Sequence, residues 1–130
     1  MNESSLKTLL EEADSCLEQK NLEQAEWLYS DLIEKSQQHP EIRALAFNNR
    51  GQAKYFRVDF DGAIEDFTES ILHCSLHTAY YNRGLIHYRM ARYQKAIDDY
   101  ERALKINSKF EDARLAMEVA KSDFENKNIC

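Results

Sequence analysis

The amino-acid sequence predicts an all-α protein built as a stacked helical solenoid. Residues 46–71 match residues 79–104 when the chain is shifted by 33 positions, and a repeat of that length is typical of helix-turn-helix solenoids. Large aromatic and aliphatic residues recur at helical spacing, with a small residue inside each half of the repeated unit. Three Gly, one Pro and 31% charged residues are what a chain of helices joined by short turns should contain.

The repeated residues are identical or differ by one hydroxyl group. They form the motifs F-x-N-R-G…Y…F-x-x-A-I-x-D-F, from Phe47 to Phe67, and Y-x-N-R-G…Y…Y-x-x-A-I-x-D-Y, from Tyr80 to Tyr100. These motifs resemble the tetratricopeptide repeat (TPR) family. The resemblance implies a right-handed TPR solenoid with seven helices in one domain over residues 1–130. Its parts would be three helix-turn-helix repeats at about 4–38, 41–75 and 77–108, a capping helix at about 109–124, and a frayed tail at 125–130.

The first repeat is degenerate, with Ala13 where the later copies have Gly51 and Gly84. From Ala25 to Ala63 is 38 residues, so we expect about four extra residues in the connection around 37–41. The expected helices run over about 4–19, 22–38, 41–57, 60–73, 79–90, 93–107 and 109–124. Side-chain caps are expected from Asn21 with Gln24, from Asp59, and from Ser108 with Glu111.

Composition and charge exclude several classes of partner. The net charge of −6 argues against nucleic acid, whose binding needs clustered Lys and Arg. No segment is apolar enough to span a membrane, so no membrane partner is expected. Three widely separated cysteines and an N-terminus without a secretory signal favour a reduced compartment. We expect the cytoplasm, with the nucleus as the alternative.

No arrangement of residues in the sequence predicts catalysis, and we expect neither an enzyme nor a cofactor. Nucleophile elbows and phosphate-binding glycine loops are absent from the sequence. His73, Cys74 and His77 have donor atoms suited to a metal, but their spacing matches no common zinc module. We interpret them as polar residues of an inter-repeat turn and expect no metal.

Two matching ion pairs are hypothesised. Arg50 precedes Asp66 by 16 residues, and Arg83 precedes Asp99 by the same interval. Each pair would join the two helices of one repeat. The alternative is that both arginines are exposed to solvent, where such pairs contribute only about 0–1 kcal/mol.

The TPR resemblance also implies a concave groove, lined by the first helix of each repeat, that binds a protein or peptide partner of unknown identity. Asn side chains suit an extended peptide backbone, and Tyr offers a large contact area at low entropic cost. For Tyr55 and Tyr88, packing against a neighbouring repeat is the alternative. The expected groove residues are Asn48, Asn49, Gln52, Tyr55, Phe56, Tyr81, Asn82, Leu85, Tyr88 and Arg89.

Chaperone-binding members of the family clamp the carboxylate of a C-terminal tail with basic residues. Here only Asn49 matches, because Leu10, Asp14, Thr78 and Asn82 stand at the other clamp positions. We therefore expect no binding to an acidic chaperone tail. The leading hypothesis is an adapter that uses the groove, and the alternative is a structural subunit that oligomerises or docks through its terminal helices.

Overall fold

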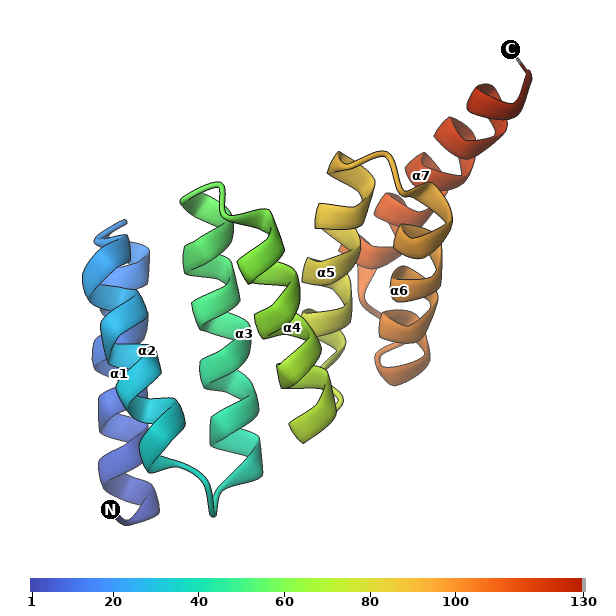
Figure 1. Ribbon diagram of the computed structural model, residues 1–130. Helices are drawn as coiled ribbons and strands as arrows, with labels where there is room; N and C mark the ends of the chain where they lie inside the picture. Colours follow the sequence, from blue (N-terminus) through green and yellow to red (C-terminus); the bar gives the residue numbers. More distant parts are fainter. Residues whose placement is uncertain (130) are drawn as a thin grey trace. The chain divides into compact units, whose positions relative to one another are not determined.

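The computed structural model describes residues 1–129, which form seven α-helices and no strand (Figure 1). The all-α class is therefore confirmed for this part of the chain. The helices are α1 (Glu3–Glu18), α2 (Leu22–Lys35), α3 (Pro40–Phe56), α4 (Phe60–His73), α5 (His77–Arg89), α6 (Tyr93–Ile106) and α7 (Glu111–Ile129).

The chain divides into two compact units. The first unit, Met1–Ser75, contains α1 to α4, and the second begins at Leu76 and contains α5 to α7. The single domain expected from the sequence remains a prediction.

Each helical hairpin turns through a residue in the left-handed backbone region. Lys20, Val58 and Ala91 have φ values of 61°, 66° and 58°. In all three turns the following residue donates its N–H to a carbonyl five residues earlier, for example Asp59 to Lys54 O at 2.8 Å. This is the Schellman arrangement, and it satisfies the free carbonyls at the helix end without a glycine.

The repeated glycines allow an aromatic ring to lie directly on the partner helix. A Cβ atom on Gly51 would be 2.6 Å from the Phe67 ring, and one on Gly84 would be 2.7 Å from the Tyr100 ring. Both distances are shorter than a carbon–carbon contact, so these two sites accept only glycine without a shift of the ring. The small residue predicted at each crossing is therefore required by packing.

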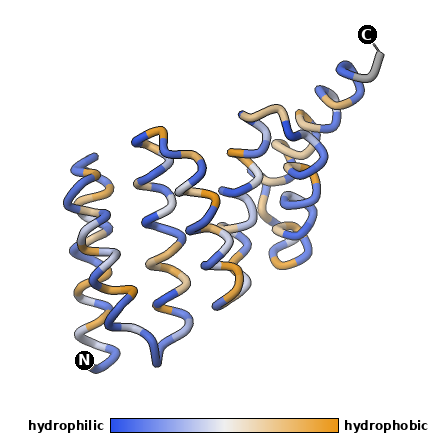
Figure 2. The backbone as a smooth tube through the Cα atoms, in the orientation of Figure 1, coloured by the Kyte–Doolittle hydropathy of each residue, from blue (hydrophilic) through white to orange (hydrophobic). Residues whose placement is uncertain are grey.

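Each unit has its own hydrophobic core, and Figure 2 shows hydrophilic and hydrophobic residues alternating along the helices. The first core includes the fully buried Leu6, Tyr29 and Leu32. In the second unit, Ile97 and Tyr100 of α6 pack with Met117 and Phe124 of α7. Burial of each such side chain contributes about 1.5–3 kcal/mol, so the large repeated residues supply most of the stability.

The extra residues between the first two repeats lie mainly inside a helix rather than in the connection. α3 has 17 residues and α5 has 13, whereas the link before α3 spans only residues 36–39. Pro40 begins α3 because its fixed φ and missing N–H suit the first helical position. The insertion thus adds about one turn to the start of α3.

Two of the three expected caps are wrong. Asp59 does accept the Gly62 N–H at 3.0 Å, but the Asn21 side chain makes no cap bond. Ser108 is not adjacent to a helix either, because Asn107 Oδ1 accepts the Lys109 N–H at 3.2 Å and the resulting turn delays α7 until Glu111. A further cap lies at Asn2, whose side chain accepts the Ser5 N–H at 2.8 Å, and it was not predicted from the sequence.

α7 begins later and continues further than predicted. Residues 125–129, expected to fray, are helical, while Cys130 lies outside the described residues. Phe124 packs in the second core, and Lys127 Nζ lies 5.9 Å from the centre of the Tyr93 ring. These contacts hold the last turns of α7 against α6.

Candidate partner-binding surface

The predicted groove residues fall into two sets. Five lie on α3 in the first unit and five on α5 in the second. A single groove through both sets remains a prediction.

On α3, a stripe of side chains combines apolar ends with an amide centre. Leu45, Asn49, Gln52 and Phe56 are spaced to lie on one helix face. Leu45 is 37% exposed and Phe56 is 45% exposed, with Asn49 and Gln52 half-buried between them. Asn48 points elsewhere, since it is only 4% exposed and its Nδ2 donates to Asn49 Oδ1 at 3.0 Å. Asn48 thus orients Asn49.

Asp14 of α1 holds this stripe in place. Its Oδ1 accepts the Tyr29 hydroxyl at 2.5 Å and the Asn49 amide at 2.9 Å, so one carboxylate oxygen ties α1 to both α2 and α3. Burial, and then the bond to Asp14, raise the pKa of the Tyr29 phenol, which keeps it a protonated donor. The sequence predicted that Asp14 lacks the base of a clamp position but did not predict this network.

The aromatic residues of the two sets pack largely against their own units. The Tyr81 ring lies 4.9 Å from that of Phe110, and the Tyr55 ring lies 5.7 Å from that of Phe60. Tyr88 packs in the second core and its hydroxyl donates to Asp123 of α7, a bond that raises the pKa of the phenol. These contacts favour the packing interpretation for Tyr55 and Tyr88.

The remaining predicted residues of α5 differ in burial. Leu85 packs against the second core, Asn82 is half-buried, and Arg89 is exposed. Within the second unit, α7 therefore covers much of the predicted face of α5.

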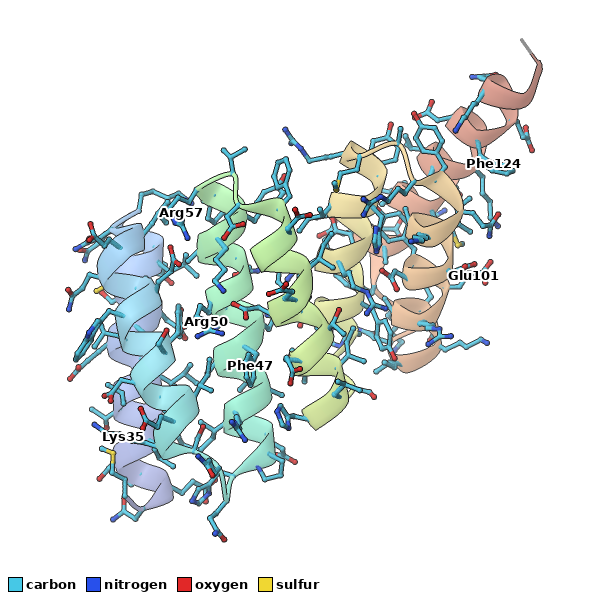
Figure 3. The ribbon with its side chains drawn as sticks, viewed as in Figure 1. Lys35, Phe47, Arg50, Arg57, Glu101 and Phe124 are labelled. Atoms are coloured by element: carbon cyan, nitrogen blue, oxygen red, sulfur yellow. The ribbon has the colours of Figure 1, made fainter. Side chains whose placement is uncertain are left out.

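Both hypothesised ion pairs are confirmed. In each pair, an arginine donates two hydrogen bonds to an aspartate on the other helix of the same hairpin, and we call this arrangement a clasp. Arg50 Nε and Nη2 donate to the two oxygens of Asp66, each at 2.8 Å. Arg83 donates in the same way to Asp99, at 2.9 and 2.7 Å. The carboxylates are only 3% and 4% exposed, and these hydrogen bonds raise the pKa of both arginines. Arg50 also donates to Ser30 Oγ of α2 at 3.0 Å, and Figure 3 labels it on α3.

The histidines considered as metal ligands pack against aromatic rings. The His73 ring stacks on Phe47 at 5.4 Å, and the His77 ring meets Phe110 edge-on at 5.1 Å. Over residues 1–129 the structure contains no group of three His, Cys, Asp or Glu side chains placed to hold a metal ion. Across the same residues, every helix is too short or too polar to cross a bilayer.

Charge is distributed unequally between the units. The first unit has 15 acidic and 7 basic residues, a net charge of −8, whereas the second has 8 acidic and 10 basic residues, a net charge of +2. The acidity of the chain thus comes entirely from α1 to α4 and their turns.

Comparison with known proteins agrees with this architecture. Residues 77–110 match the family model described as the tetratricopeptide repeat. The Sgt2 TPR domain from Aspergillus fumigatus superposes with a TM-score of 0.86 at 20% identity, covering 97% of this chain and 83% of that one. The chain has a TPR fold.

Two further TPR structures were solved with peptides. The first TPR of Spaghetti (RPAP3), bound to the HSP90 peptide SRMEEVD, has a TM-score of 0.85 at 19% identity, covering 96% of this chain and 97% of that one. The myosin chaperone UNC-45 from C. elegans, in complex with an Hsp90 peptide, has a TM-score of 0.81 at 18% identity, covering 94% of this chain and 14% of that one.

Among curated proteins, human tetratricopeptide repeat protein 4 is 25% identical over 108 residues, which is 82% of this chain. The chain spans only 28% of the length of that relative.

Proposed function

We propose that this protein is a non-catalytic adapter that binds an extended or helical segment of a partner protein on its first-helix surfaces. The observation that carries the proposal is the α3 stripe, in which two exposed apolar side chains flank amides beside a fixed carboxylate. Amides can pair with a peptide backbone, and flanking apolar groups add contact area. The TPR fold and the peptide complexes of structures that share it support this assignment.

Substitution of the stripe tests the adapter function. Gln52→Ala with Phe56→Ala removes one amide and one exposed ring, and neither residue belongs to the buried core. We expect the double variant to lose its captured partner in proximity labelling while its melting temperature changes little. A matched control is Leu72→Ala with Thr68→Ala on α4. Equal partner capture by the wild type and the stripe variant would reject the proposal.

Acidic chaperone tails fit this surface poorly, although two structural neighbours carry Hsp90 peptides. In the first unit, Asp14 presents a negative charge at a clamp position where a basic side chain is expected, and Leu10 supplies no cation. In the second unit, Thr78 and Asn82 supply no cation at the other two positions. We therefore propose that the partner is not an acidic tail. Micromolar binding of the peptide SRMEEVD in a fluorescence titration would contradict this.

Docking through a terminal helix is the second candidate function. Leu115 and Val119 lie one turn apart on α7 and are 48% and 51% exposed. Such a pair is suited to an assembly contact. Loss of the partner only after truncation from Ser108 onward would favour this alternative over the α3 stripe.

A closer relation within the family and a location in the cell are also proposals. Residues 48–52 and 54–60 resemble tetratricopeptide repeat protein 32 of animals. The cysteine usage favours the cytoplasm, or the nucleus, and fluorescence imaging of the tagged chain would test this.

A further inference from the structure

The surface formed by α1 and α3 carries negative charge that the fold does not neutralise. We call it the α1–α3 face and define it by Glu11, Asp14 and Glu18 of α1 and by the α3 stripe, Leu45, Asn49, Gln52 and Phe56. Glu11, Asp14 and Glu18 share one side of α1, since they are three and seven residues apart.

Some other acids of the first unit have basic partners, while others, such as Glu12 and Glu34, form no ion pair among the described residues. Asp66 is held by Arg50 and by Lys54 at 3.2 Å, and Glu26 is held by Arg57 at 2.6 Å. Among the described residues, no Lys, Arg or His forms an ion pair with Glu11, Asp14 or Glu18. Asp14 is moreover half-buried, where a charge is screened less by water and salt than at an open surface.

The geometry of Asp14 leaves part of it available to a ligand. Both of its hydrogen bonds end on Oδ1, from Tyr29 and Asn49, so Oδ2 is left as an acceptor. The Gln52 amide, on the same face, also has no partner among residues 1–129. A carboxylate oxygen suits a cationic side chain, and an amide suits a peptide backbone.

The two ends of the face differ in their surroundings. At one end, an open cavity of about 360 Å³ is lined by apolar residues, by the connection before α3 and by charged residues of α1 and α3. The lining residues are Leu45, Ile42, Pro40, Gln38, His39, Glu3, Lys7 and Glu41. At the other end, Lys20 Nζ lies 3.5 Å from the centre of the Phe56 ring. The ammonium group of Lys20 therefore covers one side of the Phe56 ring and places a positive charge at this end of the face.

We propose that the α1–α3 face binds an extended, Lys- and Arg-containing segment of a partner protein with at least one apolar anchor. The inference rests on the proposed adapter function and names the chemical class of its partner. Basic side chains would meet Asp14, Glu11 and Glu18, the anchor would enter the cavity beside Leu45, and the backbone would pair with Gln52. The net charge of −8 on the first unit attracts such a segment to the unit, and Glu11, Asp14 and Glu18 add a local charge on this face.

The test compares three synthetic peptides of about ten residues. All three have Leu and Ser at the same positions, and the alternate positions carry Lys in the first peptide, Gln in the second and Glu in the third. The peptides therefore differ only in charge. The full chain, labelled with ¹⁵N, is titrated with each peptide and followed by NMR and by fluorescence anisotropy. We expect the Lys peptide to bind about tenfold more tightly than the Glu peptide, with shifts at Asn49 and Gln52. Tighter binding of the Gln or Glu peptide at this face would overturn the inference and leave the adapter function standing.

Paired variants separate a local effect from net charge. Glu11→Gln with Glu18→Gln removes two charges from the face, and Glu12→Gln with Glu34→Gln removes two exposed charges elsewhere in the first unit. The first pair should weaken the Lys peptide about threefold to tenfold, and the second should have a smaller effect. Equal weakening by both pairs would show attraction by net charge alone and would overturn the inference. If none of the peptides shifts Asn49 or Gln52, the adapter function fails together with it.

Discussion

The hairpin α3–α4 in the first unit and the hairpin α5–α6 in the second have the same clasp in different electrostatic surroundings. In each, an arginine donates two bonds to a buried aspartate of the partner helix. The other basic residue near the aspartate differs between the hairpins. Lys54 Nζ lies 3.2 Å from Asp66, whereas Nε2 of His87, at the equivalent position, lies 3.9 Å from Asp99. The repeated motif therefore specifies the clasp, and the residue at the position of Lys54 and His87 is one of several differences in the charge that surrounds it.

The two hairpins also differ where their second helices begin. Asp59 caps α4 through the Gly62 N–H at 3.0 Å, whereas Arg92 stands at the equivalent position before α6 and makes no side-chain cap. A cation at a helix N-terminus also opposes the helix dipole. The second hairpin thus forms the same turn with less local support.

Removal of the buried carboxylate should have the largest effect and should distinguish the hairpins. Asp66→Asn leaves Arg50 and Lys54 without a counter-charge, whereas Asp99→Asn leaves Arg83 beside a histidine. Breaking such a pair costs about 3–5 kcal/mol, so both variants should have a lower free energy of unfolding than the wild type. The decrease should be larger for Asp66→Asn than for Asp99→Asn. Urea denaturation measures the change in the free energy of unfolding.

Asp98→Asn is the matched control for these variants, because Asp98 is exposed and adjacent to Asp99. If Asp99→Asn lowers the free energy of unfolding no more than Asp98→Asn does, the clasp contributes little to stability.

Exchange of the caps should have an intermediate effect. Asp59→Ala should lower the free energy of unfolding by about 1 kcal/mol, because one N–H at the start of α4 loses its acceptor. Arg92→Asp should raise it by about 0.5–1 kcal/mol by adding a cap and removing a cation from the start of α6. Thermal melts of the two single variants should therefore shift in opposite directions, and shifts of the same sign would contradict the difference between the two helix starts.

The pH dependence contributed by His87 should be the smallest of the three effects. Burial lowers the pKa of His87 below its usual 6.5, and Arg83, Arg92 and Lys95 lower it further, while Asp99 opposes them. Because the unfolded chain then binds the proton more readily, the stability from neutral His87 is complete above about pH 6.5 and declines as the pH falls toward the folded pKa.

The variant His87→Gln should therefore lose less stability than the wild type between about pH 7 and pH 5. His39→Gln, at the start of α3, is the control for a histidine in the other unit. An unchanged pH profile for His87→Gln would remove this difference between the hairpins.

Agreement between the sequence analysis and the structure depends on how far apart the interacting elements lie. The pairs Arg50–Asp66 and Arg83–Asp99 were predicted because each lies within one hairpin, where the repeat spacing determines which side chains face each other. The bond from Asn49 to Asp14 was missed, since it joins α1 to α3 across 35 residues. Its existence depends on the packing of three helices, for which no local pattern is diagnostic.

Neighbouring residues on one helix show the same limit. Asn48 and Asn49 are chemically identical, and both were assigned to the groove. A rotation of about 100° between successive residues leaves Asn48 buried and Asn49 half-exposed. The length of α7 was underestimated for a related reason, because Phe124 and Lys127 are held by contacts with the second core and with Tyr93.

The sequence by itself determined the helical class, the repeated hairpins and the residues at which their helices touch. These features follow from short-range spacing, and the same spacing occurs in both repeats. Tertiary structure alone decided the contacts between hairpins, such as the bonds of Asp14 to Tyr29 and Asn49, and which acids outside the repeated pairs find a basic partner. The reason is that a charge is compensated only when a second helix brings an opposite charge within about 4 Å, and that proximity depends on packing between elements distant in the chain.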